Sequence, residues 1–522
     1  MRIVRLVVSY RSRGFIHKRR SSESQNLIRI YNSLTQTVEP FDPPAPLITW
    51  YTCGPTVYDD IHIGHASCYI QQDCIRRVLE KYQPKPVVYA MGVTDVDDKI
   101  IKKAKDSGKR ETEVAAKYEL QFFNALEKLN VRRPDVILRV SDYIPKIIDF
   151  IQSLIEKKYA YVTPSGNVFF DSQSFPKEGK FDPVVLSKQS EQREEIMQRS
   201  PTKFHPEKKN RADFALWKSR ISDEVSWPCP WGEGRPGWHI ECSSFCDVIS
   251  GGMPHLTIHS GGVDLKFPHH NNEICQSEAF YETDSWVKVF MHIGAMVDSE
   301  TGLKMSKSLQ NFISVDDFLD SHGTSDELRV TCLRRSYRST LPYSKDDLNL
   351  SRHFLIRVAE TLDFCDQQMK SCTGCGDGVE SNLDFIEKSS WKFGRAICDD
   401  FDFPSGLEVI SSFCDSIRGR NLQMTDAVLA KQFLISTLNL MGIEMSSEVE
   451  QSASERALLE ELTRFRNVVR EFSLGKTNRD GRKLSKSEMK QLAAENEPLL
   501  AECDNVRSFI NDLSLKNMND SD

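Results

Sequence analysis

The sequence lacks three features that would each restrict the class of protein. It has no uncharged apolar run of about 18 residues, the length that crosses a bilayer, so we expect no membrane partner. Its 14 cysteines are scattered over 522 residues, which excludes a small secreted disulfide scaffold and indicates a reducing compartment. Its formal net charge of -7 excludes wholesale coating of nucleic acid, but an RNA could still dock on a local basic face.

Acidic residues are also absent from the first 22 positions. That segment contains serines and the basic residues Arg2, Arg5, Arg11, Arg13, Lys18, Arg19 and Arg20. Such a composition is typical of an organellar transit peptide, and a disordered basic tail is the alternative. A secretory signal is disfavoured because Arg5 interrupts the apolar stretch and no small-residue cleavage site follows. We therefore predict a protein of the mitochondrial matrix.

The length predicts several domains, since 522 residues exceed one typical core. Residues 23–46 are polar and rich in proline, so we expect a linker, with the folded part beginning near Leu47. A strand at 48–53, a periodic apolar helix at 66–82 and the buried run KPVVYAMGV follow. Strand, helix and strand in this order predict an α/β fold with a parallel sheet.

The pattern then changes twice along the chain. Charged helices, the short strand GNVFF and a stretch rich in Lys, Glu and Gln from 188 to 211 indicate an inserted domain. The sheet pattern resumes through LTIHSGG and WVKVFMHIGAMV, and beyond about residue 315 the pattern is helical, which predicts a terminal helical bundle. The predicted divisions are 1–22 transit peptide, 23–46 linker, 47–125 and 226–315 nucleotide-binding halves, 126–225 insertion, 316–350 connecting region, 351–510 helical domain and 511–522 disordered tail.

Two short motifs predict a nucleotide site. His62, Gly64 and His65 stand in HIGH, where a strand gives way to a helix, so that backbone N–H groups and the helix dipole can face a polyphosphate. Lys304 and Lys307 stand in KMSKS after a glycine turn and offer ammonium groups to a developing pyrophosphate charge.

Both motifs have near-copies in the same chain. HIGA at 292–295 ends a predicted strand without a following helix, so we assign it to sheet structure. KLSKS at 483–487 lies in a charged helical tail and is interpreted as a solvated basic face. Order and context therefore identify the functional copies.

A second constellation predicts a metal site from Cys53, Cys242, His269 and Glu273. The spacing of His269 and Glu273 is i, i+4, so on a helix both face one metal, and two thiolates, an imidazole and a carboxylate make a zinc set. We expect His270 to point elsewhere. Cys246 or Cys275 could substitute on chemical grounds, and a buried structural zinc is the alternative role. The lone C-x-x-C at Cys372 and Cys375 has no second pair, so we leave it outside the active site.

Several segments together resemble one family, cysteinyl-tRNA synthetase of class I. They are YTCGPTVYDDIHIGH, GVTDVDDKI, DFALWK, PWGEGRPGWHIECS, FPHHNNE and KMSKSLQNF. The resemblance covers roughly residues 48 to 345. HIGHASCY and IHSGGVDL are more similar to the mitochondrial branch than to bacterial forms. The resemblance implies a Rossmann-type catalytic domain split by an insertion and followed by a helical anticodon-binding domain, with 316–350 contacting the tRNA stem.

The resemblance also implies roles for single residues. One zinc per chain, held by Cys53, Cys242, His269 and Glu273, would bind the thiol of the substrate and separate cysteine from serine. His62, His65, Lys304 and Lys307 would stabilise the reaction of cysteine with ATP and Mg²⁺, and Gly64 would contact ATP. Residues near the amino acid would be Gly54, Thr94, Trp238, His259 and His269. The product would be cysteinyl-tRNA(Cys), made by a monomer or a homodimer.

Other functions stay open at this point. A ligase that joins cysteine to an amino-sugar shares the catalytic half but lacks the helical extension, and a non-catalytic RNA-binding zinc scaffold is of another class. Family members are credited with cysteine persulfide synthesis using pyridoxal phosphate on the lysines of KIIK, here Lys99 and Lys102. The tail lacks the DRIRDEL-like helix of many members. A basic run in it is compatible with phosphate contact: Arg456, Arg464, Arg466, Arg470, Lys476, Arg479, Arg482 and Lys483.

Overall fold

The computed structural model describes residues 27–175, 180–181, 205–221, 224–299, 301–303, 305, 312–371 and 382–445. The chain divides into two compact units, residues 1–444 and 445–522, and the described helices and strands all belong to the first unit. The boundary lies inside the range 351–510 that the sequence predicts as one helical domain. Among the described helices, none is long and apolar enough to cross a membrane.

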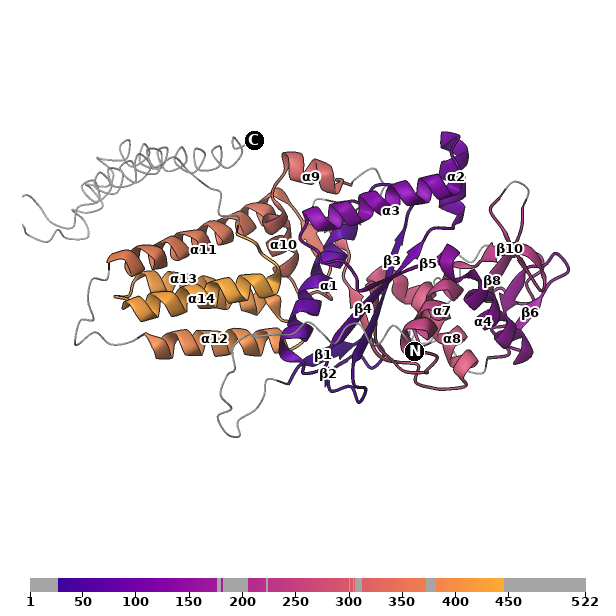
Figure 1. The fold of residues 1–522 in the computed structure, drawn as a ribbon, viewed down its shortest axis with the longest axis horizontal. Helices are drawn as coiled ribbons and strands as arrows, with labels where there is room; N and C mark the ends of the chain where they lie inside the picture. Colours follow the sequence, from indigo (N-terminus) through magenta and orange to yellow (C-terminus); the bar gives the residue numbers. More distant parts are fainter. Residues whose placement is uncertain are drawn as a thin grey trace, which may run out of the picture. The chain divides into compact units, whose positions relative to one another are not determined.

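A parallel five-stranded sheet forms the centre of the unit (Figure 1). Its strand order is β12-β11-β3-β4-β5, and every neighbouring pair is parallel. The strands are β3 (Ile48–Thr56), β4 (Val87–Thr94), β5 (Val136–Arg139), β11 (Leu256–Gly262) and β12 (Val287–Ile293). Buried Ile, Val, Leu and aromatic side chains fill them, as expected for strands covered on both faces. The predicted α/β fold with a parallel sheet is confirmed.

Helices flank this sheet and connect its strands. They are α1 (Ile63–Tyr82), α2 (Asp98–Ser107), α3 (Glu111–Lys128), α4 (Ile144–Glu156), α7 (Trp238–Ser250) and α8 (Asn271–Tyr281), with short turns η2 (Val140–Tyr143), η3 (Val263–Leu265) and η4 (Lys266–His270). Figure 1 shows α1 and α3 on one side of the sheet and α7 and α8 on the other. Both faces of the sheet are therefore covered.

The inserted domain begins later in the sequence than predicted, and it also ends later. Its five-stranded antiparallel sheet has the order β6-β7-β8-β10-β9, formed by β6 (Ala160–Val162), β7 (Val168–Phe170), β8 (Phe214–Ser219), β9 (Trp227–Cys229) and β10 (Gly232–Pro236). The predicted strand GNVFF is β7. The predicted boundaries at 126 and 225 were wrong, because β5 pairs with β4 in the central sheet and β10 still pairs with β8.

The predicted linker at 23–46 was also wrong where the structure describes it. A hairpin forms from β1 (Arg29–Asn32) and β2 (Thr37–Pro40), and Ile28 and Ile30 are buried. The Asn32 side chain donates to the carbonyl of Lys288 and accepts from the amide of Phe290, which fixes the hairpin beside β12. The polar, proline-rich composition predicted a linker. A short hairpin can nevertheless fold here, because a neighbouring strand satisfies its polar groups.

Beyond the sheet the chain is helical as predicted. The elements are β13 (Met296–Asp298), α9 (Val315–Ser321), α10 (Ser325–Leu333), β14 (Leu341–Tyr343), α11 (Lys345–Ser371), α12 (Leu383–Cys398), α13 (Phe403–Arg418) and α14 (Met424–Met441). Helices α11 to α14 pack on one another as a bundle (Figure 1). Residues 446–522, with the basic run and the KLSKS copy, lie outside the described residues.

A buried ion network joins the end of this bundle to α1. Arg329 on α10 is fully buried and donates to Asp73 on α1 at 2.9 Å and to the carbonyls of Asn130 and Met441 at 2.8 and 3.2 Å. Burial alone would raise the pKa of Asp73, but Arg329, Arg77 and Arg132 hold that pKa below its ordinary value. The C-terminal carbonyls of α14 thus meet guanidinium groups, which suits the negative end of a helix dipole.

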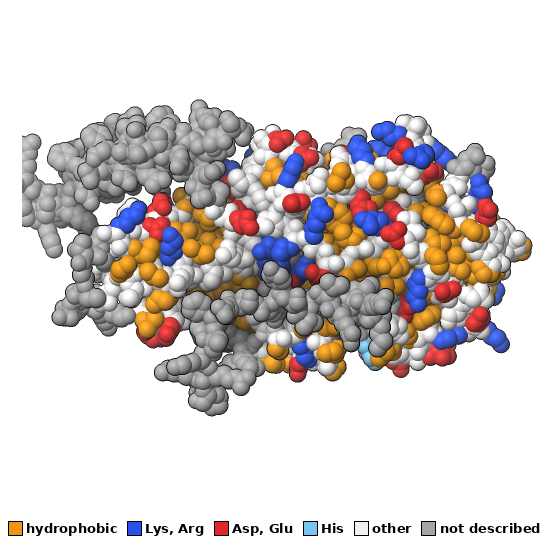
Figure 2. All heavy atoms as spheres, in the orientation of Figure 1, with side chains coloured by type: hydrophobic (Ala, Val, Ile, Leu, Met, Phe, Trp, Pro, Cys, Tyr) orange, Lys and Arg blue, Asp and Glu red, His pale blue; other side chains and the backbone are white. Residues whose placement is uncertain are grey.

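Surface charge is mixed on the face drawn in Figure 2. Lysine and arginine side chains there alternate with aspartate and glutamate over the described residues. This agrees with the small net charge of the chain.

Candidate active site

The HIGH motif lies at the start of α1, and Met305, the one described residue of the KMSKS motif, lies beside it. His62 is the N-cap of this helix and is buried, and its Nδ1 accepts the amide of His65 at 3.3 Å. The imidazole rings of His62 and His65 stack with centroids 3.8 Å apart. The strand-to-helix placement predicted for HIGH is confirmed.

Residues between and after the KMSKS lysines contact this segment. A Cβ added to Gly64 would lie 3.2 Å from the Cβ of Met305, and the amide of Ile63 donates to the carbonyl of Ile313 at 3.0 Å. The ring of Phe312 lies 5.8 Å from that of His62. Lys304 and Lys307 themselves lie outside the described residues, so their roles stay predictions.

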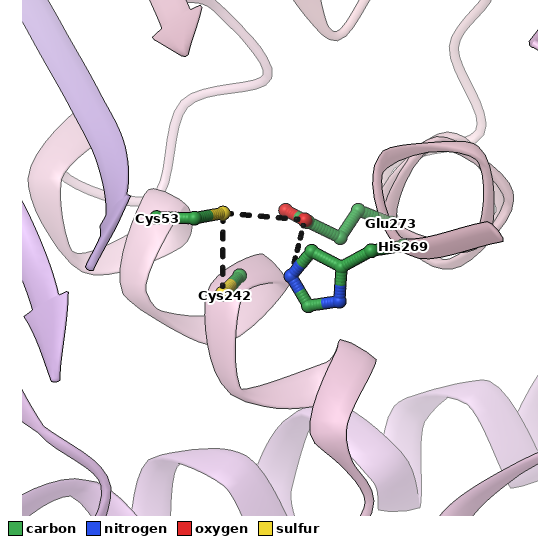
Figure 3. Close-up of side chains that lie close together, drawn as sticks. All are labelled: Cys53, Cys242, His269 and Glu273. Atoms are coloured by element: carbon green, nitrogen blue, oxygen red, sulfur yellow. Dashed lines mark hydrogen bonds and ion pairs between the residues drawn. The ribbon is translucent and has the colours of Figure 1, made fainter. Parts of the chain in front are cut away.

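Four ligand groups converge at the carboxyl edge of the sheet. Cys53 lies on β3, Cys242 on α7, His269 in η4 and Glu273 in the first turn of α8, and their side chains point toward one another (Figure 3). All four side chains are buried, and one ligand atom from each lies within 4.8 Å of the others. The structure thus brings together the four residues that the sequence predicted as a metal site.

The spacings within this cluster suit a tetrahedral zinc ion. In a tetrahedral site, zinc–ligand bonds of about 2.0 to 2.3 Å imply distances of roughly 3.3 to 3.8 Å between the ligand atoms, which are the edges of the tetrahedron. The observed edges are 3.7 Å between the sulfurs of Cys53 and Cys242, 3.8 Å from Cys53 to Glu273 Oε1, and 3.1 Å from His269 Nε2 to Glu273 Oε1. The donor set of sulfur, nitrogen and oxygen also matches zinc.

Burial disfavours the charged forms of the ligand groups. It raises the pKa values of the Cys53 thiol and the Glu273 carboxyl and lowers that of the His269 imidazole. A bound dication reverses this preference for the thiol and carboxyl groups, because its charge stabilises their anions. The cluster can therefore hold a divalent metal.

The prediction for His270 was wrong. Its Nε2 lies 3.4 Å from Cys53 Sγ, and its Nδ1 lies 2.8 Å from His292 Nε2. Because His269 and His270 belong to the irregular turn η4, whose Phe267 has extended backbone, the simple helical spacing does not fix where His270 points.

A second possible ligand group contains Cys53, His259, His270 and Glu273. We favour the first group because Cys53, Cys242 and His269 all line the adjoining pocket. His259 is outside the pocket lining, and its Nε2 lies 2.7 Å from Glu273 Oε2. His259 and His270 then act as outer partners that orient the ligands. Cys246 and Cys275 belong to neither group.

A pocket opens directly over the cluster. Its lining includes Gly54, Thr94, Trp238 and His269, four of the five residues predicted to lie near an amino acid. His259 is fully buried behind Glu273 and is not in the lining. The Trp238 indole is 41% exposed and its centroid lies 4.2 Å from that of His269, so it is placed to cover the pocket.

Sequence reasoning missed part of this pocket. Tyr51, Gly92 and Phe245 also line it, and the Tyr51 side chain is fully buried. Alternation along a strand could have found Tyr51, because residues two apart on β3 share the face of Cys53. A Cβ on Gly54 would lie 2.1 Å from the carbonyl oxygen of Gly92, so the close approach of β3 and β4 requires this glycine.

The near-copy at 292–295 is sheet structure, as predicted. His292 is buried at the end of β12, where burial lowers its pKa to about 3. Its neutral ring contacts His270 and the rings of Phe181 and Phe290. The next described element along the chain is the short strand β13 rather than a helix.

Comparisons with known proteins agree with this architecture. The family model "tRNA synthetases class I (C) catalytic domain" matches residues 42–353, more than half of the chain. The chain is 36% identical over 507 residues to the "Probable cysteine--tRNA ligase, mitochondrial" of Xenopus tropicalis, covering 92% of this chain and 86% of that protein. It is 38% identical over 391 residues to the cysteine–tRNA ligase of Staphylothermus marinus, covering 74% and 79%.

Solved structures show the same fold at low identity. A leucyl-tRNA synthetase of Agrobacterium radiobacter K84 aligns with a TM-score of 0.56 at 12% identity, covering 77% of this chain and 85% of that one. A methionyl-tRNA synthetase of Mycobacterium tuberculosis aligns with a TM-score of 0.52 at 13% identity, covering 76% and 90%. These alignments show the fold, and the catalytic-domain match and the sequence relatives show that the chain belongs to the cysteine–tRNA ligase family of class I tRNA synthetases.

Proposed function

We propose that this aminoacyl-tRNA synthetase selects cysteine with one zinc ion held by Cys53, Cys242, His269 and Glu273. The single observation that carries the proposal is the convergence of these four groups at the floor of the pocket. Bound zinc would supply a Lewis acid that takes a thiolate far more readily than an alcohol, which separates cysteine from serine. No editing domain is then needed.

The pocket residues would bind and orient the amino acid. Gly54 and Thr94 come from the carboxyl ends of β3 and β4, the edge where α/β sheets bind ligands. Trp238 would cover the amino acid, and His259 would hold Glu273 in place through its 2.7 Å hydrogen bond. These placements support the substrate contacts that the family resemblance implies.

The nucleotide would lie between HIGH and KMSKS. We propose that His62, Gly64 and His65 face the phosphates of ATP, with Mg²⁺ accompanying it, and that Lys304 and Lys307 stabilise the leaving pyrophosphate. The cysteine carboxylate attacks the α-phosphorus, and the resulting adenylate transfers cysteine to the terminal ribose of tRNA(Cys). No enzyme nucleophile is required, so the residues act by alignment and charge.

Cysteine-dependent ATP–pyrophosphate exchange tests this proposal. We expect exchange with cysteine, none with serine, loss on removal of zinc by a chelator and recovery on adding zinc. Activity that survives complete zinc removal would contradict the zinc role. Absence of exchange in the zinc-loaded protein would favour a non-catalytic scaffold.

The tRNA as acceptor is supported by similarity beyond the catalytic half. The match to the Xenopus tropicalis protein covers 92% of the chain, so it includes the helical region that an amino-sugar ligase would lack. We propose that α11 to α14 bind the anticodon region of tRNA(Cys). Transfer of labelled cysteine to tRNA(Cys), with an amino-sugar as the competing acceptor, distinguishes the two ligases.

A mitochondrial site of action is supported by the name of that relative and by the acid-free basic start of the sequence. Residues 1–22 lie outside the described residues. Fusion of this segment to a fluorescent protein tests the proposal, because import into the matrix is expected for the native segment and not for one whose arginines and lysine are replaced by glutamine.

Persulfide synthesis stays a prediction. Lys99 and Lys102 are exposed on α2, and the Lys99 ammonium lies 5.2 Å from the centroid of the Tyr58 ring. A lysine aldimine of pyridoxal phosphate would give an absorbance band in the purified protein. Absence of the band after incubation with the cofactor would remove this function.

A further inference from the structure

A buried carboxylate lies behind the amino-acid pocket and has no assigned role. Glu241 stands in the first turn of α7, beside the ligand Cys242, and is 2% exposed. Within the described part of the chain it forms no ion pair with a lysine, arginine or histidine at salt-bridge distance. Its side chain instead contacts the hydroxyl of Thr94, which donates to Glu241 Oε2 at 2.9 Å.

Thr94 connects this carboxylate to the pocket. It is the last residue of β4 and lines the pocket together with Cys53 and His269. A threonine hydroxyl has one proton and two lone pairs, so a hydroxyl that donates its proton to Glu241 can only accept from a ligand. An ammonium group is the complementary partner, because it can only donate.

The charge of the Glu241 carboxylate also favours an ammonium group as the ligand. Burial away from water disfavours the charged form of Glu241 and raises its pKa well above the ordinary value, and the positive end of the α7 dipole compensates this only in part. An amino acid whose thiol reaches the cluster of Cys53 and Cys242 would bring its own positive charge into this pocket. The ammonium then offsets the charge of Glu241.

We propose that Glu241 is a positioning residue that holds Thr94 as an acceptor for the α-ammonium of the substrate and supplies the opposing charge. The proposal rests on the proposed function, since it requires that this pocket binds the amino acid. It assigns the two ends of the pocket. The sulfur of the substrate lies at the metal ligands, and its ammonium group lies at Thr94. Glu241 does not touch the substrate.

The test compares ligands with and without the amino group. In the zinc-loaded full chain, the KM for cysteine is measured by pyrophosphate exchange, and 3-mercaptopropionate, which lacks the amino group, is measured as a competitive inhibitor. Glu241→Gln removes the charge and lets an amide N–H donate to Thr94. We expect the KM for cysteine to rise about 10- to 100-fold and the Ki of 3-mercaptopropionate to change less than about twofold.

A merely structural role predicts another result. If Glu241→Gln raises KM and Ki equally, or changes neither, the proposal is overturned. The zinc content of each variant is measured alongside, since loss of zinc would weaken both thiols together. Glu327→Gln is the matched control, because Glu327 is a buried acid on α10 that pairs with Arg352 away from the pocket.

Thr94 variants keep the test decisive if Glu241→Gln fails to fold. Thr94→Ser retains the hydroxyl and should stay close to the wild type, whereas Thr94→Val should weaken cysteine and spare 3-mercaptopropionate. Equal effects of the two substitutions overturn the proposal. In the double variant with Glu241→Gln, the two losses should be less than additive because they remove one interaction. Absence of exchange in the wild type would instead overturn the proposed function itself.

Discussion

The sulfur atoms of Cys53 and Cys242 lie 3.7 Å apart although 189 positions separate the two residues in the chain. Cys53 ends the buried part of β3, and Cys242 lies one turn into α7, which packs on β3 and β4. The inserted domain lies within the chain segment between them, together with α1, β4 and β5 of the catalytic domain. The metal site is therefore as rigid as the contact between this helix and the sheet.

Removal of one sulfur ligand should abolish zinc binding. Cys242→Ala is expected to lose the bound zinc and to reduce cysteine-dependent exchange by at least about 100-fold, as measured by metal analysis and pyrophosphate exchange. Cys246→Ala is the matched control: this buried cysteine is on the same helix but belongs to neither ligand group. Retention of zinc by the Cys242 variant would refute the assignment.

The two KMSKS-like segments should differ in effect. Lys307→Ala is expected to slow adenylate formation by about 100-fold while the zinc content stays intact, because a lysine there stabilises developing charge. Lys486→Ala, in the near-copy KLSKS, should leave exchange unchanged. Pre-steady-state adenylate formation measures both, and equal rates for the Lys307 variant and the wild type would remove that lysine from the mechanism.

The buried network at Arg329 should dominate the stability of the junction with the bundle. Arg329→Met removes the fully buried donor that Asp73 shares with the carbonyls of Leu129 and Asn130, although Asp73 keeps its contacts with Arg77 and Arg132. We therefore expect a loss of about 2 to 4 kcal/mol in the free energy of unfolding by urea. Arg335→Met is the control, because Arg335 is exposed six positions further on. A loss below about 1 kcal/mol at Arg329 would contradict the network's role.

Stability should fall as pH rises through the titration of Asp326. Burial raises its pKa to about 6, above the ordinary aspartate value of 3.8, and its Oδ1 accepts the amide of Glu444. The folded state then binds the proton of the Asp326 carboxyl more tightly than the unfolded state does. The contribution of this proton to the free energy of unfolding is therefore complete below pH 3.8 and lost above pH 6.

Asp326→Asn should remove this pH dependence. Urea unfolding between about pH 4 and pH 8 is expected to show that the variant gains about 3 kcal/mol over the wild type at the upper end. Asp384→Asn, an exposed residue paired with Lys388, serves as the control and should show little change. A wild type and an Asp326 variant with parallel pH profiles would contradict the prediction.

Local sequence determined the features that depend on a few neighbouring residues. The strand-to-helix position of HIGH, the i, i+4 pair His269 and Glu273, the parallel sheet and the helical bundle all follow from period, caps and spacing. Family motifs added Cys53 and Cys242, which spacing alone does not connect.

Tertiary structure decided what lies between distant segments. It placed β5 in the central sheet, turned a predicted linker into a hairpin beside β12, and directed His270 toward Cys53. It also put Glu241 behind Thr94, although 147 positions separate them. Such contacts depend on strand register and on which helix face meets the sheet, and these are set by packing of the whole core rather than by any short stretch of sequence.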